Sequence, residues 1–160
     1  MLRFFIRRGC PSYRILLNLK QTMWKAMLAF SLSSLPLYSN SMYSSPLIAA
    51  IEQIESTGNP NAVGDNGAAY GILQIHRGVV EDVNRVYHLK WEHRDMFKPV
   101  YARMVFHRYM EIYCTEKRLG RPVTDEDRAR IWNGGPNGWK KKRTVNYWLR
   151  VKNVLENARD

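Results

Sequence analysis

Residues 54–75 read IESTGNPNAVGDNGAAYGILQI, and this stretch decides the fold because it joins an apolar helical pattern to a loop dense in glycine and asparagine. Upstream, Ser45 can cap a helix and Pro46 suits its first turn, and apolar residues then recur at helical spacing. The pattern predicts a helix that ends near Glu55, after which the chain doubles back. The sequence Asp65-Asn66-Gly67 is typical of the turn of a short hairpin.

Glu55 is the strongest candidate for a catalytic group. A carboxylate at the carboxyl end of a helix gains nothing from the helix dipole, and apolar neighbours further disfavour its charged form. We therefore expect the pKa of Glu55 to be raised. A carboxylic acid that stays protonated near neutral pH can protonate the leaving oxygen of a glycosidic bond. A lone Glu at a helix end is more often an ordinary solvated residue, so the interpretation rests on the motif around it.

The blocks around Glu55, and others farther along the chain, resemble those of the soluble lytic transglycosylase family and the related goose-type lysozymes. Together they cover about residues 46 to 155 in the right order. They are Glu55-Ser56, Asn59-Pro60-x-Ala62, Gly71-x-x-Gln74-Ile75, the segment RIWNGGP at 130–136 with Trp132 where tyrosine is usual, and Tyr147 within VNYWLRV at 145–151.

This resemblance implies a mostly helical (α+β) lysozyme-like domain at 46–157, with a small hairpin or loop lobe after the catalytic Glu. It implies action on the amino-sugar backbone of peptidoglycan, with Glu55 first as general acid and then as general base. The resemblance also implies a raised pKa for this Glu, as is known for the catalytic acid of lysozyme. The residues expected to orient Glu55 or to hold sugar are Ser56, Gln74, Asn133 and Tyr147.

The fate of the cleaved sugar depends on whether a second carboxylate is present. A lytic transglycosylase needs one carboxylate, because the C6 hydroxyl of the substrate closes a 1,6-anhydro ring, whereas an inverting hydrolase needs a second to activate water. Asp65 is the candidate, since its place resembles that of the second carboxylate in goose-type lysozymes. Those enzymes also carry an acid just after the Gln block, where this chain has His76. We therefore favour the transglycosylase, with Asp65 as a turn residue, and keep the hydrolase as the alternative.

The rest of the chain is expected to be helical. Short helices are predicted near 79–86 and 125–132, the latter starting at a capping box formed by Thr124 and Asp127. A long central helix is predicted over 99–119. A last helix over 144–157 should place Val145, Trp148, Val151 and Leu155 on one face and Tyr147 on a neighbouring face, where its hydroxyl could reach Glu55.

The charge of the chain is concentrated in its first part. The first 51 residues hold six basic residues and no acid, and removing those six from 25 leaves 19 basic against 14 acidic residues, a formal +5. The dense cluster Lys140-Lys141-Lys142-Arg143 leaves open a small basic module that binds the wall or nucleic acid without catalysis. We expect no nucleic-acid partner, because the leader is typical of export.

Residues 1–41 are interpreted as a leader. The apolar run at 26–37 suits a signal peptide, and Met23 would be a better start than Met1, so the first residues could be an upstream extension; an organelle transit peptide is the minor alternative. The expected location is secreted or periplasmic, with a phage protein as an option, and no membrane span is expected after leader removal. Neither the histidine spacing nor the two distant cysteines indicates a metal site, and no cofactor is expected.

Overall fold

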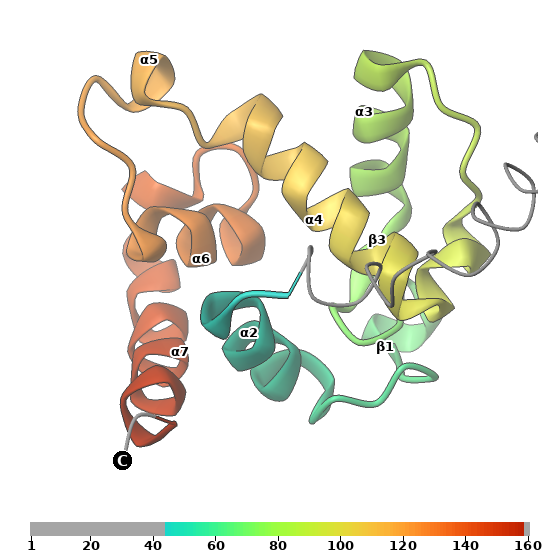
Figure 1. The fold of residues 1–160 in the computed structure, drawn as a ribbon, viewed down its shortest axis with the longest axis horizontal. Helices are drawn as coiled ribbons and strands as arrows, with labels where there is room; N and C mark the ends of the chain where they lie inside the picture. Colours follow the sequence, from blue (N-terminus) through green and yellow to red (C-terminus); the bar gives the residue numbers. More distant parts are fainter. Residues whose placement is uncertain (1–43, 159–160) are drawn as a thin grey trace, which may run out of the picture. The chain divides into compact units, whose positions relative to one another are not determined.

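The computed structural model describes residues 44–158, so the predicted leader lies outside the described residues. The domain is mostly helical with a small sheet, as the sequence predicts (Figure 1). Its helices are α2 (Pro46–Ser56), α3 (Arg77–Tyr87), α4 (Pro99–Tyr113), α5 (Glu116–Leu119), α6 (Asp125–Gly134) and α7 (Val145–Asn157). Short 3-10 turns are η1 (Asp65–Gly67), η2 (His93–Phe97), η3 (Gly138–Lys140) and η4 (Lys142–Thr144).

Helix α2 carries Glu55 in its last turn, and its ends follow from the sequence. The Ser45 hydroxyl accepts a hydrogen bond from the Ile48 amide at 3.3 Å, and Pro46 occupies the first turn. At the other end, Thr57 adopts the left-handed conformation with φ 54°, and its amide donates to Gln53 and Glu52 carbonyls. The helix thus ends at Ser56, one residue after Glu55, and the chain turns toward the sheet.

The sheet is a three-stranded antiparallel lobe in the order β1 (Val63–Gly64), β2 (Ala69–Tyr70), β3 (Ile75–His76). The predicted hairpin is confirmed, since η1 joins β1 to β2. Strand β3 adds to it with Ala69 opposite His76. Gly71, between β2 and β3, has φ 76°, and a Cβ there would lie 2.0 Å from the Met96 carbonyl oxygen, so only glycine fits the turn.

The structure differs from the sequence-based prediction in two helices. The predicted helix 99–119 is broken at Cys114, which has φ −114° and ψ 66°, and the Thr115 hydroxyl then caps the separate helix α5. In α7 the buried face is formed by Tyr147, Val151 and Leu155, whereas Val145 is 37% exposed. Trp148 is partly buried and packs against the core, so the prediction was wrong for Val145, whose inward place is taken by Tyr147.

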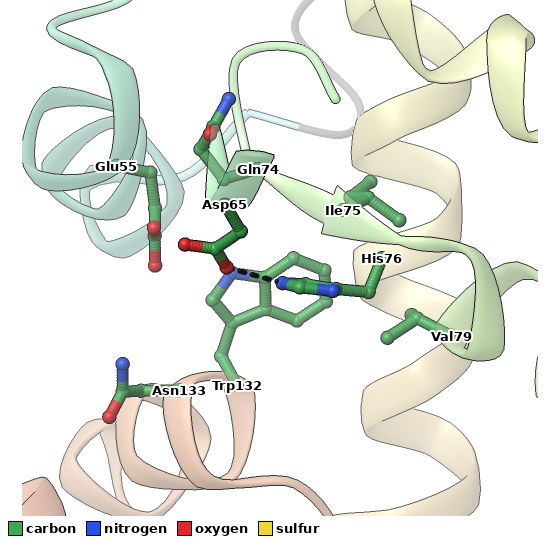
Figure 2. Close-up of a pocket in the computed structure, with 8 residues that line it drawn as sticks. All are labelled: Glu55, Asp65, Gln74, Ile75, His76, Val79, Trp132 and Asn133. Atoms are coloured by element: carbon green, nitrogen blue, oxygen red, sulfur yellow. Dashed lines mark hydrogen bonds and ion pairs between the residues drawn. The ribbon is translucent and has the colours of Figure 1, made fainter. Parts of the chain in front are cut away.

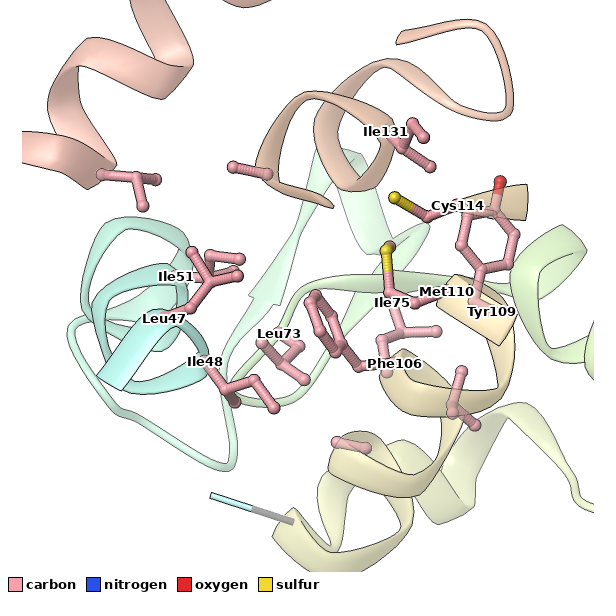
Figure 3. Close-up of a cluster of buried hydrophobic side chains, with 14 of the residues drawn as sticks. Leu47, Ile48, Ile51, Leu73, Ile75, Phe106, Tyr109, Met110, Cys114 and Ile131 are labelled. Carbon is pink, nitrogen blue, oxygen red and sulfur yellow. The ribbon is translucent and has the colours of Figure 1, made fainter. Parts of the chain in front are cut away.

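The core connects the lobe to the helices beneath the site. Figure 3 shows Leu73 between the apolar face of α2 and Phe106 of α4. Ile48, Ile51 and Leu73 are at most 1% exposed, and burial of each such side chain contributes about 1.5–3 kcal/mol. On its other side α2 packs on α6 and α7. The segment that carries Glu55 is therefore fixed by packing on both sides. Within residues 44–158, no helix combines the length and apolar character that crossing a bilayer requires.

Candidate active site

A cavity of about 280 Å³ opens between the end of α2, the strand lobe and the end of α6 (Figure 2). Four of the residues singled out from the sequence line it, namely Glu55, Asp65, Gln74 and Asn133. The remaining walls are formed by Ile75, His76, Val79 and Trp132. The cavity thus brings together an acid from a helix, a second acid from a turn, two amides and an indole ring.

Glu55 enters the cavity from the last turn of α2 and is held by Tyr147. The Tyr147 hydroxyl donates to Glu55 Oε1 at 2.7 Å, and Tyr147 is only 4% exposed. This contact joins residues 92 positions apart and depends on the packing of α7 against α2. The Tyr147 hydroxyl therefore fixes the orientation of the Glu55 carboxyl group.

The environment of Glu55 raises its pKa above the ordinary value. The largest cause is burial, which removes the carboxylate from water. The hydrogen bond from Tyr147 and the charge of Arg150 act in the opposite direction, while the negative charge of Asp65 raises the pKa and His76 lowers it. Burial outweighs the rest, so the carboxyl group retains a proton to higher pH than a solvated Glu does. The pKa of Tyr147 is also raised, by burial and by the neighbouring Glu55, which keeps its hydroxyl a donor.

Asp65 and His76 form a hydrogen-bonded pair on the opposite wall. His76 Nε2 donates to Asp65 Oδ2 at 2.8 Å, and the side chains of His76 and Asp65 are 51% and 69% exposed. Asp65 has φ 47°, a conformation that non-glycine residues rarely adopt. In Figure 2, Asp65 lies between Glu55 and His76, and its other carboxylate oxygen points toward Glu55. Asp65 is thus a turn residue whose side chain also belongs to the cavity.

Gln74 supports the lobe and faces the cavity at the same time. Its Nε2 donates to the carbonyls of Gly71 at 2.9 Å and Ala62 at 3.3 Å, which satisfies the amide in the way expected of a structural Gln. A Cβ on Gly64 would lie 2.1 Å from Gln74 Oε1, so glycine at this position makes room for the side chain. Within residues 44–158, no hydrogen bond reaches Oε1, which leaves this atom free to accept from a sugar.

Trp132 and Asn133 come from the last turn of α6. Trp132 packs on Phe106, with ring centroids 4.9 Å apart, and Asn133 is exposed. The following turn is tightly built, because a Cβ on Gly138 would lie 1.9 Å from the Arg130 carbonyl oxygen. Lys141 Nζ donates to the Gly134 carbonyl at 2.5 Å, so this member of the basic cluster is already engaged in holding the turn.

Two predicted site residues do not line the cavity: Tyr147, which acts on Glu55 from α7, and Ser56. The Ser56 hydroxyl donates to the Ile72 carbonyl at 2.9 Å and contacts the Glu52 carbonyl at 3.3 Å. Ser56 therefore ties the end of α2 to the segment before β3. Its observed contacts position the backbone next to Glu55.

The fold agrees with comparisons to known proteins. The sequence model of the family described as "Transglycosylase SLT domain" matches residues 38–123, which is more than half of the chain. The chain belongs to the transglycosylase SLT domain family. Among solved structures, this SLT domain is similar to a lysozyme from Tapes japonica, with 25% identity and a TM-score of 0.56, over 68% of this chain and 88% of that one. No curated protein sequence matches the chain. These findings place it among the lysozyme-like glycosidases related to peptidoglycan.

Sequence reasoning missed part of the cavity. It treated His76 as a departure from the goose-type pattern and gave no site role to Val79. It also gave none to Arg150, whose charge acts on Glu55 from outside the cavity lining. The alternation of β3 could have predicted that His76 faces away from the core. Ile75 is 1% exposed, and successive side chains of a strand point to opposite faces. Within residues 44–158, no group of three or more His, Cys, Asp or Glu side chains could hold a metal ion.

Proposed function

We propose that this SLT domain is a peptidoglycan lytic transglycosylase that cuts the β-1,4 bond between N-acetylmuramic acid and N-acetylglucosamine. The proposal rests chiefly on one observation: the half-buried Glu55 lines the cavity and accepts a hydrogen bond from the Tyr147 hydroxyl at 2.7 Å. A pKa raised by burial favours the protonated form of Glu55, which glycosidic cleavage requires.

The first step is proton transfer from Glu55 to the glycosidic oxygen, which leaves with the departing sugar as the C1–O bond breaks. The positive charge that develops at C1 lies near the Glu55 carboxylate formed in this step. In the second step the carboxylate takes the proton of the C6 hydroxyl, whose oxygen attacks C1 and closes a 1,6-anhydro ring. Glu55 regains its proton, no water is consumed, and one carboxylate suffices.

The remaining cavity residues suit a neutral amino sugar. Gln74 Oε1 and the Asn133 amide offer hydrogen-bond partners for hydroxyl and acetamido groups, and Trp132 offers a flat apolar surface. Tyr147 keeps the acid oriented toward the glycosidic oxygen. Because the proposed substrate is a wall polymer, we propose that the enzyme acts outside the cytoplasm, in the cell envelope.

Mass analysis of the products tests this proposal. Purified peptidoglycan is digested with the wild-type protein and with Glu55→Gln, and the soluble fragments are weighed before and after borohydride reduction. We expect anhydro ends, which borohydride does not reduce, from the wild type and no fragments from Glu55→Gln. Undigested peptidoglycan with the wild type, or equal digestion by both proteins, would refute the assignment.

A muramidase that hydrolyses the same bond is the second candidate, and the Asp65–His76 pair favours it. The Asp65 carboxylate lines the same cavity as Glu55, and one of its oxygens points toward Glu55 (Figure 2). In a hydrolase, Asp65 would take a proton from a water whose oxygen attacks C1. Reducible ends from the wild type that become anhydro ends in Asp65→Asn would support hydrolysis; anhydro ends from both proteins would exclude it.

A further inference from the structure

A second cavity, of about 520 Å³, lies between α3 and the segment that leads into η2. An intermediate cavity of about 260 Å³ borders on both this cavity and the catalytic one. This intermediate cavity shares His76 with the catalytic cavity and shares Tyr70, Arg77 and His93 with the larger one. The three cavities are therefore neighbours, and a ligand that extends from the catalytic cavity past the Asp65–His76 pair would reach the other two.

The second cavity has a rigid floor and a rigid rim. Tyr70 stacks on His93 with ring centroids 4.0 Å apart, and His93, 8% exposed, donates to the Ile75 carbonyl at 2.6 Å. The Asn84 side chain bonds both the Trp91 carbonyl at 2.8 Å and the Trp91 amide at 3.1 Å. These contacts preform the cavity, which reduces the entropy cost of binding.

The lining of the second cavity carries charge, unlike the amide and indole groups that face a sugar next to Glu55. Arg77 and Arg94 supply positive charge, and Glu81 and Glu92 supply negative charge. Arg94 is paired with Glu92 at 2.8 Å, whereas Arg77 is exposed and makes no hydrogen bond or ion pair within residues 44–158. Arg77 lines both the intermediate and the second cavity, so its guanidinium is available to a carboxylate.

We propose that the second cavity binds the peptide stem that N-acetylmuramic acid carries, with Arg77 binding a carboxylate of that stem. Glycan hydroxyl and acetamido groups are neutral, and the stem is the charged part of the polymer. Glu92 is already paired with Arg94, which leaves the Glu81 carboxylate for the free amino group that many stems hold. This inference rests on the proposed function, because it takes the sugar next to Glu55 as the point from which the stem extends.

Matched substrates test the inference. One is stem-bearing glycan strands, and the other is the same strands after an amidase has removed the stems. The variant is Arg77→Gln, and the control is Arg85→Gln, which removes the same charge from α3 at an exposed residue paired with Asp82 outside these cavities. Because Arg77 has no partner to lose, the variant is expected to fold.

We expect the wild type to cleave stem-bearing strands with a kcat/KM about tenfold above that for bare strands, the gain of one charge-assisted hydrogen bond. Arg77→Gln should lose this preference through a higher KM and cleave bare strands at the wild-type rate, and Arg85→Gln should keep it. An equal effect of Arg77→Gln on both substrates, or none on either, would overturn the inference.

Binding of the isolated stem separates this inference from the proposed function. If the wild type cleaves neither substrate, the proposed function fails, and calorimetry with a synthetic stem tetrapeptide decides the subsite alone. Binding to the wild type and to Arg85→Gln but not to Arg77→Gln supports the subsite. Failure of the wild type to bind, or equal binding by all three proteins, contradicts it.

Discussion

The two acidic side chains of the cleft, Glu55 and Asp65, lie in opposite environments. Glu55 is half buried at the end of a packed helix and receives a hydrogen bond from the buried Tyr147. Asp65 is 69% exposed in a turn of the lobe and is bonded to His76. Burial raises the pKa of the first carboxyl group, whereas water and an imidazole surround the second. The difference teaches that environment, not residue type, assigns the role of acid.

The largest expected effect comes from removing the acid itself. Glu55→Gln keeps the shape and the ability to accept from Tyr147 but has no proton to transfer, so the rate of wall lysis should fall about 100- to 10,000-fold. The measurement is turbidity loss of a peptidoglycan suspension, with Glu156→Gln on α7 as the control for loss of one carboxylate. Retention of more than about a tenth of the wild-type rate would mean that Glu55 is not the proton donor.

The pH at which activity is lost on the alkaline side should shift in opposite directions in Tyr147→Phe and Asp65→Asn. Tyr147→Phe removes a hydrogen bond that lowers the pKa of Glu55, so the alkaline loss of activity should move to higher pH, with a rate loss of about tenfold from poorer orientation. Asp65→Asn removes a negative charge that raises this pKa, so the same limb should move to lower pH.

Rates measured across the pH range for wild type and both variants check this prediction. Circular dichroism confirms that the variants are folded over that range. Shifts of the same sign in Tyr147→Phe and Asp65→Asn would show that the alkaline limb does not report the Glu55 carboxyl group.

The smallest expected effect is on stability. Because the folded-state pKa of Glu55 is above the ordinary 4.5, its ionisation costs free energy in the folded state, and this cost appears as pH rises through the unfolded and then the folded pKa. Glu55→Gln should therefore melt a few degrees above the wild type at pH 7 and equally at pH 3. Thermal melts at both pH values measure this, and a variant that is less stable at pH 7 would argue against a burial cost.

The helices around the site could be predicted from their caps. Ser45 with Pro46 predicted the start of α2, and Thr124 with Asp127 predicted the start of α6. Such caps can be recognised because their hydrogen bonds join residues that are close in the sequence. The break of the long helix at Cys114 could not be predicted, because the helical spacing of apolar residues continues across it. The family resemblance predicted that Tyr147 lies near Glu55. The apolar spacing of the last helix instead put Tyr147 on a face next to the apolar one, so its burial was not predicted.

The Asp65–His76 pair lay beyond the reach of sequence reasoning for a physical reason. The pair needs the register that puts Ala69 opposite His76 and the left-handed backbone of Asp65. Neither is encoded by residue type within one segment, because non-glycine residues adopt positive φ rarely and strand register depends on the whole lobe. Local patterns thus predicted Glu55 as the acid, whereas the Asp65–His76 pair that faces it depends on tertiary structure.

The central claim is that helix packing makes Glu55 the protonated carboxyl group of the cleft. Carbon-detected NMR titration of the Glu55 carboxyl in the wild-type protein, and in Tyr147→Phe, tests it most directly. We predict a pKa above 4.5 in the wild type and a higher value in Tyr147→Phe. A wild-type pKa at or below 4.5 would contradict the account, because Glu55 would then carry a charge where a proton is required.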